Sequence, residues 1–210
     1  MTTVGEILDE FFSPFSSERL WIMPSSDNYT RIVREWRPVI DAMSRIKAKL
    51  PKSCAVWEAS YKTKAAWAPT MSDAPKQGAY REFVASPPGT DYVTCREAFV
   101  VYWLSRSAKL VVSPVFPVIQ TQNLYTCSIG SFNIYTTVDA IDCAAKTATM
   151  NYWMYNSMSK RSFGRFADHP VFSMSGMATQ YMWWNWAEYV EWSSGLVRTK
   201  LSPMDKNGWK

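Results

Sequence analysis

The stretch Ser173–Trp192, SMSGMATQYMWWNWAEYVEW, is the most aromatic part of the chain, and the interpretation of the fold depends on it. It holds four of the eleven tryptophans and three of the eleven methionines. Aromatic side chains bury roughly 150–250 Å² each, so this cluster forms the centre of a core or of a contact surface. The composition leaves both possibilities open.

Two secondary structures fit this stretch. As a helix it is apolar over most of its circumference, and Gly195 offers a C-terminal stop. As a strand it places Met182, Trp184, Trp186, Val190 and Trp192 on one face, with Glu188 as the exception. We favour an apolar C-terminal helix over residues 174–192.

The N-terminal half has a helical pattern. Apolar residues recur at three- and four-residue steps from Asp27 to Leu50, and Ser26 or Asp27 can cap this helix. Pro38 interrupts the pattern, which predicts a kink or two helices with Pro38 in the first turn of the second. A short helix is also expected over residues 3–12.

β-branched and aromatic residues become frequent after residue 109. They predict a small antiparallel sheet near residues 109–138, followed by an alanine-rich helix over 139–150 capped by Asp139. The expected fold class is therefore α+β, with a predominantly helical N-terminal half, this small sheet and the apolar C-terminal helix.

We expect one domain over residues 1–210, with an N-terminal arm (1–27) and a loop-rich segment (68–91). The acidic N-terminus does not resemble a secretory signal, and no apolar run reaches the roughly 20 residues that a transmembrane helix needs. These features favour synthesis in a cytosol-like compartment. The four cysteines form no CxxC pair, which favours buried free thiols over a metal site.

Known catalytic patterns are missing from the sequence. It shows no phosphate-binding glycine loop, nucleophile elbow or metal cluster, and its one histidine, His169, has no partner cysteine or serine motif. We therefore expect no enzymatic activity, no catalytic or metal-binding residues and no cofactor.

Basic residues gather in one part of the chain. Residues 28–64 hold nine bases and three acids, although the whole protein carries a net charge of only +5. A solvated helix face explains such a run, and so does a surface that follows a phosphate backbone. A second stretch, 151–172, interleaves bases with aromatic residues, a mixture suited to single-stranded nucleic acid and also to a core with a basic rim.

The favoured hypothesis is a self-assembling nucleic-acid-binding protein of the viral coat or nucleocapsid type, which binds single-stranded RNA without strong sequence specificity and would be found in the virion. The expected phosphate contacts are Arg31, Arg34, Arg37, Arg45, Lys47, Lys160, Arg161 and Arg165. Trp21, Trp183, Trp184 and Trp186 are the expected anchors of the core or of assembly between copies. The alternative is a membrane-surface or pore-forming protein that uses its aromatic cluster at the lipid boundary, and a membrane partner is the less favoured of the two.

Overall fold

The fold is taken from a computed structural model of the 210-residue chain. The structure describes residues 4–49, 53–54, 69–73, 80–85, 95–100, 102, 124–163, 177–193 and 196–200. For residues 161, 163, 192, 193 and 196–200 it describes the backbone alone.

The named elements are four helices and six strands. The helices are α1 (Val4–Phe12), α2 (Asn28–Glu35), α3 (Arg37–Ala48) and α7 (Lys160–Phe163). The strands are β1 (Arg19–Met23), β2 (Tyr80–Val84), β3 (Phe132–Asp142), β4 (Thr147–Met158), β5 (Gln180–Ser193) and β6 (Leu196–Lys200). Residues 95–100 and 124–127 are also helical.

The helical pattern at 27–50 is confirmed as two helices. The Asp27 side chain accepts a hydrogen bond from the Tyr29 backbone N–H and so caps α2. Pro38 lies in the first turn of α3, where a missing N–H costs nothing because no intrahelical acceptor is available there. The helix expected near the N-terminus is α1, which buries Val4, Ile7, Leu8 and Phe11.

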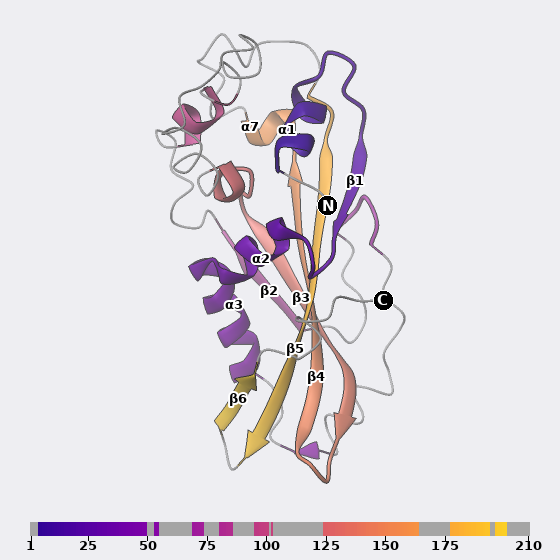
Figure 1. The fold of residues 1–210 in the computed structure, drawn as a ribbon, viewed down its shortest axis with the longest axis vertical. Helices are drawn as coiled ribbons and strands as arrows, with labels where there is room; N and C mark the ends of the chain where they lie inside the picture. The colour runs from indigo at the N-terminus through magenta and orange to yellow at the C-terminus, as the bar shows by residue number, and fades with distance from the viewer. Residues whose placement is uncertain are drawn as a thin grey trace.

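The strands form one mixed sheet in the order β1-β5-β4-β3-β2 (Figure 1). The pairs β5–β4, β4–β3 and β3–β2 are antiparallel, whereas β1 runs parallel to β5. β6 pairs antiparallel with residues 189–193 of β5, whereas β1 pairs with residues 180–184 of the same strand. The long strands β3, β4 and β5 follow the long axis of the molecule, with α2 and α3 beside them.

The prediction of an apolar C-terminal helix is wrong, because Gln180–Ser193 is the strand β5. Its even-numbered residues Met182, Trp184, Trp186 and Val190 face the main core. Trp183, on the opposite face, is also buried, in a second cluster with Tyr135 and Tyr155. A strand buried on both faces loses the alternation of polar and apolar residues that distinguishes it from a buried helix.

The main core fills the space between the sheet and the helices. It combines the inner faces of β1, β3, β4 and β5 with the apolar sides of α1, α2 and α3. The second cluster lies on the other face of the sheet, with Leu20, Trp153 and Tyr181 packed against its three buried rings. Burial on both faces explains the high aromatic content without any contact between copies of the chain.

The predicted fold class is therefore contradicted in three respects. The sheet is mixed and reaches from residue 19 to residue 200, so it is neither small nor purely antiparallel nor confined to 109–138. The described part of the N-terminal half contains β1 and β2 as well as helices, and so does not form a helical half. The described C-terminal part is built of strands.

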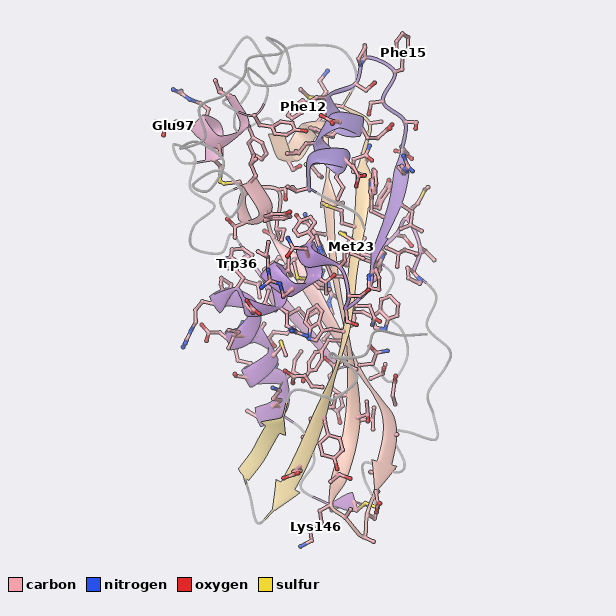
Figure 2. The ribbon with its side chains drawn as sticks, in the orientation of Figure 1. Phe12, Phe15, Met23, Trp36, Glu97 and Lys146 are labelled. Atoms are coloured by element: carbon pink, nitrogen blue, oxygen red, sulfur yellow. A yellow bond between two sulfur atoms is a disulfide. The ribbon has the colours of Figure 1, made fainter. Side chains whose placement is uncertain are left out.

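The helix expected at 139–150 is a β-hairpin instead. β3 continues to Asp142, whose carboxylate accepts hydrogen bonds from the backbone N–H groups of Ala144 and Ala145. An Asp side chain that bonds to the backbone two and three residues ahead stabilises a turn. Lys146 closes this turn with a φ of 55° and projects at the end of the molecule opposite Phe15 (Figure 2).

The cysteines form disulfides, so the prediction of free thiols is also wrong. Cys54 is bonded to Cys143 in the β3–β4 turn, and Cys95 is bonded to Cys127. The partners lie 89 and 32 residues apart in the sequence. Their pairing depends on the tertiary fold, so sequence spacing gave no sign of it.

Candidate functional site

A pocket of about 340 Å³ is lined by residues at the start of β3, at the end of β4 and on α7. Figure 1 labels these three elements. Most of its described wall is polar. The lining residues are Asp73, Cys127, Ser128, Gly130, Ser131, Asn133, Tyr155, Asn156, Ser157, Met158 and Ser162. A concave site with converging polar groups is the default candidate for ligand binding.

The pocket exists because β4 is longer than its neighbour at this end. The pairing of β3 with β4 begins at Asn133 and Tyr155, whereas β4 continues to Met158 while paired with β5. Among the described strands, none pairs with residues 156–158 on the β3 side. Because successive side chains of a strand point to opposite faces, the pocket receives Asn156 from the inner face and Tyr155 from the outer face.

A helical turn followed by a tight bend forms one wall. The Ser128 hydroxyl donates to the Tyr125 carbonyl oxygen over 2.8 Å, and the Ser128 N–H donates to the Leu124 carbonyl oxygen over 3.0 Å. From α2, the Tyr29 hydroxyl contacts the Ser128 hydroxyl and donates to the Tyr125 carbonyl oxygen over 3.2 Å. Burial raises the pKa of Tyr29 well above its ordinary value, so this hydroxyl keeps its proton and holds the wall as a donor.

Asn156 is the most informative lining residue. It is 3% exposed, and its Nδ2 group donates to the Ser128 carbonyl oxygen over 3.2 Å. No group of the described residues donates to its Oδ1 atom. Among the described residues, Asn156 Oδ1 is not one of the fully buried polar atoms that lack a hydrogen-bond partner, so it is reached from the pocket. Asn156 is therefore suited to a ligand that brings a hydrogen-bond donor.

Asp73 lies on the opposite wall in a fixed position. Its Oδ1 atom accepts from the Tyr135 hydroxyl and its Oδ2 atom accepts from Asn133 Nδ2, both over 2.5 Å. Arg81 Nη2 lies 4.0 Å from Asp73 Oδ2, and Arg81 Nε donates to Asn133 Oδ1 over 2.9 Å. Burial, followed by the Asp73 carboxylate, raises the pKa of Tyr135 far above its usual range. The carboxylate is therefore held by neutral donors and balanced by one guanidinium.

Tyr155 connects the pocket to the outer aromatic cluster. The centroids of the Tyr155 and Trp183 rings are 4.8 Å apart, and Trp183 Nε1 donates to the Thr70 carbonyl oxygen over 2.8 Å. Burial raises the pKa of Tyr155, a hydrogen bond with Ser157 lowers it, and the Asp73 charge raises it again. These contacts fix the segment that carries Thr70 and Asp73 against the sheet.

The described lining of the pocket has no histidine, lysine or arginine. Cys127 lines the pocket, but its sulfur is bonded to Cys95 and is no nucleophile. Within the described ranges, no three His, Cys, Asp or Glu side chains lie close enough together to hold a metal ion.

The predicted phosphate contacts lie elsewhere, and at least three of them, Arg37, Arg45 and Lys47, are paired with acids. Arg45 Nε lies 2.5 Å from Glu82 Oε1, and Lys47 Nζ lies 2.7 Å from Glu188 Oε2. The Lys47 side chain is only 15% exposed. A phosphate at either base would have to displace a carboxylate.

The other predicted phosphate contacts differ in exposure, or lie outside the described residues. Arg37 is 81% exposed and pairs with Asp41, while Arg31 donates to Asn28 Oδ1 over 2.8 Å. Arg34 is half-buried and Lys160 is exposed. The side chain of Arg161 and all of Arg165 lie outside the described residues, as does His169.

The four predicted tryptophan anchors are all buried within one chain. Trp184 and Trp186 are inaccessible in the main core, Trp183 is 1% exposed and Trp21 is 9% exposed. Trp21 Nε1 donates to Gln180 Oε1 over 2.8 Å, which ties β1 to β5. These tryptophans anchor the core.

Sequence reasoning missed the pocket residues entirely. Asp73 lies in a proline-rich segment, and Asn156 lies in the strand sequence NYWMYNSM. The one available signal was an isolated amide in an aromatic strand, since a buried polar group demands a partner. Nothing in the sequence indicated that these two residues share a site.

Comparison of the chain with protein-family models, curated proteins and solved structures finds no match. Among the helices that the structure describes, none has the length and apolar character needed to cross a bilayer. The functional argument therefore depends on the pocket and the surface charges alone.

Proposed function

We propose that this chain is a binding protein for a small molecule, held in the pocket between the start of β3 and the end of β4. The observation that carries this proposal is Asn156, a nearly inaccessible amide in the pocket wall whose Oδ1 atom has no donor among the described residues. This acceptor is open to the pocket, and a ligand donor would pair with it.

The supporting geometry is that of a preformed site. Ser128 and Asn133 are both more than nine-tenths buried and held by hydrogen bonds to α2 and to Asp73. Preformed sites lose less conformational entropy on binding. A volume of about 340 Å³ is near the lower end of the usual 300–1,000 Å³ for ligand sites, so the ligand is small.

Gly130 gives a direct test of the site. A Cβ atom added at Gly130 would have no atom within 4 Å, so a larger residue fits there without a clash at the backbone. We expect Gly130→Phe to obstruct the pocket. The matched control is Ser44→Phe, at an exposed position on α3.

The experiment is a fragment screen by ligand-observed NMR on the full chain. Fragments that bind the wild type and Ser44→Phe, and that lose at least about tenfold in affinity with Gly130→Phe, would support the site. Fragments that bind all three proteins equally, or a screen without any bound fragment, would overturn the proposal.

A second candidate function is binding of a polyanion such as single-stranded RNA, in a self-assembling coat or nucleocapsid. The observation that favours it is the exposed guanidinium of Arg37, with Arg31 exposed on the neighbouring helix. Arg37 is paired with Asp41 at the surface. Arg45 and Lys47 contribute less because their acidic partners, Glu82 and Glu188, are only 12% and 10% exposed.

Fluorescence anisotropy with a labelled RNA oligonucleotide tests this second candidate. Affinity that falls steeply with salt in the wild type, and that is lost with Arg31→Glu/Arg34→Glu/Arg37→Glu, would support it. Equal binding by the wild type and the triple variant would exclude these arginines. The membrane alternative is not carried further, because Trp183, Trp184 and Trp186 are buried.

We also propose that the chain folds in an oxidising compartment, in place of the cytosol-like compartment expected from the sequence. The two disulfides support this proposal, since such bonds persist where thiols are not kept reduced. Thiol labelling of the protein from its native source would test it. Four reactive thiols in freshly lysed material would count against it.

A further inference from the structure

We infer that the pocket takes a neutral, hydroxyl-rich ligand of monosaccharide size. This inference rests on the proposed small-molecule function and names the ligand class. It follows from the hydrogen-bonding groups, the charge and the volume of the described lining.

The hydrogen-bonding groups require a ligand that donates. Asn156 Oδ1 is an acceptor without a donor among the described residues. Each Asp73 oxygen accepts one hydrogen bond from the described residues, although a carboxylate oxygen has two lone pairs. A ligand that carries acceptors alone would leave Asn156 unsatisfied. A hydroxyl group donates and accepts, so it matches both these acceptors and the serine hydroxyls of the wall.

The charge excludes an anion. Asp73 is the one ionisable acid or base of the described lining apart from Tyr155, and burial keeps the Tyr155 phenol protonated. A ligand carboxylate or phosphate would lie near the Asp73 carboxylate without a cation in the described wall. Desolvating a charge without a partner is strongly unfavourable.

The charge of the described lining does not favour a cationic ligand either. Asp73 already accepts from Tyr135 and Asn133, and Arg81 lies 4.0 Å away. A ligand ammonium would compete with Arg81 for a carboxylate that is already compensated. Neutral hydroxyl groups add hydrogen bonds without disturbing this balance.

The volume sets the size of the ligand. A cavity of about 340 Å³ corresponds to roughly eleven water molecules at about 30 Å³ each. A six-membered ring with its hydroxyl groups fits this space. A ligand of this size binds weakly, with a Kd on the order of 0.1–1 mM.

Three hexoses that differ at one group provide the test. Glucose is neutral, glucuronate adds a carboxylate, and glucosamine adds an ammonium group. Galactose, mannose and myo-inositol extend the neutral set. Binding of each to the full chain is measured by saturation-transfer NMR and by isothermal titration calorimetry.

We expect at least one neutral compound to bind. If glucose binds, glucuronate and glucosamine should bind at least about tenfold more weakly than glucose. If another neutral compound binds, its own acid and amine derivatives are compared with it. An acid or amine that binds more tightly than its neutral parent would overturn the inference.

The residue test uses Asn156→Leu, which keeps the side-chain size and removes the acceptor. We expect at least about a tenfold loss of affinity, while the matched control Asn28→Leu, at a position on α2 outside the pocket, retains binding. Unchanged affinity in Asn156→Leu would overturn the role of this residue. If Asn156→Leu does not fold, Gly130→Phe and Ser44→Phe replace the pair and the same outcomes apply.

The failure of this inference is distinguishable from that of the proposed function. If fragments bind and Gly130→Phe blocks them, but no neutral polyol binds, the site stands and the ligand class is wrong. If neither fragments nor polyols bind, both are wrong.

Discussion

Lys47 on α3 and Glu188 on β5 form an ion pair inside the protein, with Nζ and Oε2 2.7 Å apart and the side chains 15% and 10% exposed. The two atoms are in contact, although they do not have the alignment of a hydrogen bond. Glu188 faces the main core from the same side of β5 as Trp184 and Trp186. The pair therefore lets an acid occupy an otherwise apolar face of the strand.

The effects of removing the two partners of this ion pair should not be additive, because removing either partner alone leaves the other charge buried and unpaired. Lys47→Met and Glu188→Leu should each lower the free energy of unfolding by about 3 kcal/mol, because each leaves a charge buried without its partner. The double variant should lose less than the sum, by about 1–3 kcal/mol. Urea denaturation of the four proteins gives this coupling, and strict additivity would contradict it.

The control for this cycle is the exposed pair Arg37 and Asp41, one helical turn apart on α3. Arg37→Met, Asp41→Leu and their double variant should show a coupling below about 0.5 kcal/mol. Similar coupling energies in both cycles would show that burial does not determine how strongly the two members of an ion pair are coupled.

Glu82 on β2 should make stability depend on pH. A hydrogen bond from Lys49, and then one from Arg45, lowers the pKa of Glu82 below its ordinary value. A lowered folded-state pKa means that this stabilisation is complete above the unfolded-state pKa and is lost as the pH falls through the folded-state pKa. Glu82→Gln should therefore be less stable than the wild type by about 1 kcal/mol near neutral pH.

This difference should shrink as the pH is lowered from about 7 to about 2, because the wild-type carboxylate becomes protonated and loses its charge. Denaturation curves across this range measure the effect. A difference that stays constant with pH would show that the charge of Glu82 contributes nothing.

The two disulfides should differ in their contribution to stability. In the chain-entropy account, a bond that closes 89 residues stabilises by about 4.6 kcal/mol and one that closes 32 residues by about 3.7 kcal/mol. Replacing both partners by alanine, one bond at a time, should therefore lower stability more for Cys54–Cys143 than for Cys95–Cys127. Guanidinium denaturation of the two variants, with the reduced wild type as reference, tests the order.

Gln180 should be more sensitive to substitution than its polar side chain suggests. Its Oε1 atom accepts from Trp21 Nε1 over 2.8 Å, and its Nε2 group donates to the carbonyl oxygens of Ser17 and Ala178, each over 2.9 Å. Gln180→Leu leaves the buried Trp21 Nε1 donor without an acceptor and removes the bonds to both carbonyl oxygens. It should lower the free energy of unfolding by about 2–3 kcal/mol.

The hydrogen bond from Trp21 can be separated from packing by a second substitution. Trp21→Phe should destabilise the wild type more than it destabilises Gln180→Leu, since the indole donor is already unsatisfied in the latter. Thermal unfolding of the four proteins measures the difference, and equal effects in both backgrounds would contradict the role of Gln180.

The helices of the N-terminal half were predictable because their signals are local. Asp27 supplies a capping side chain, Pro38 marks a first turn, and the apolar spacing identifies the buried sides of α2 and α3. Such signals depend on a few neighbouring residues, so they can be recognised without knowledge of the tertiary fold.

The sheet was harder to predict because its evidence is not local. β5 is covered on both faces, so its sequence lacks alternation, and Glu188 interrupts the apolar residues of one face. Its partner Lys47 lies on α3, far away in the sequence. The prediction of Lys47 as a phosphate contact failed to anticipate this pair, because an amphipathic helix does not show which of its bases meet an acid elsewhere. The pocket was beyond prediction for the same reason, because it depends on where β3 begins beside the end of β4.

The position of β1 also has a consequence for how the chain is made. Arg19–Met23 pairs in parallel with the first residues of β5, and Trp21 bonds to Gln180, 159 positions later. During synthesis on the ribosome, β1 and its apolar side chains have no sheet to join until β5 has emerged. Contacts this distant in sequence slow folding and prolong the time for which an unpaired strand is exposed to aggregation, so yield in the cell should depend on chaperone capacity more than the final stability implies.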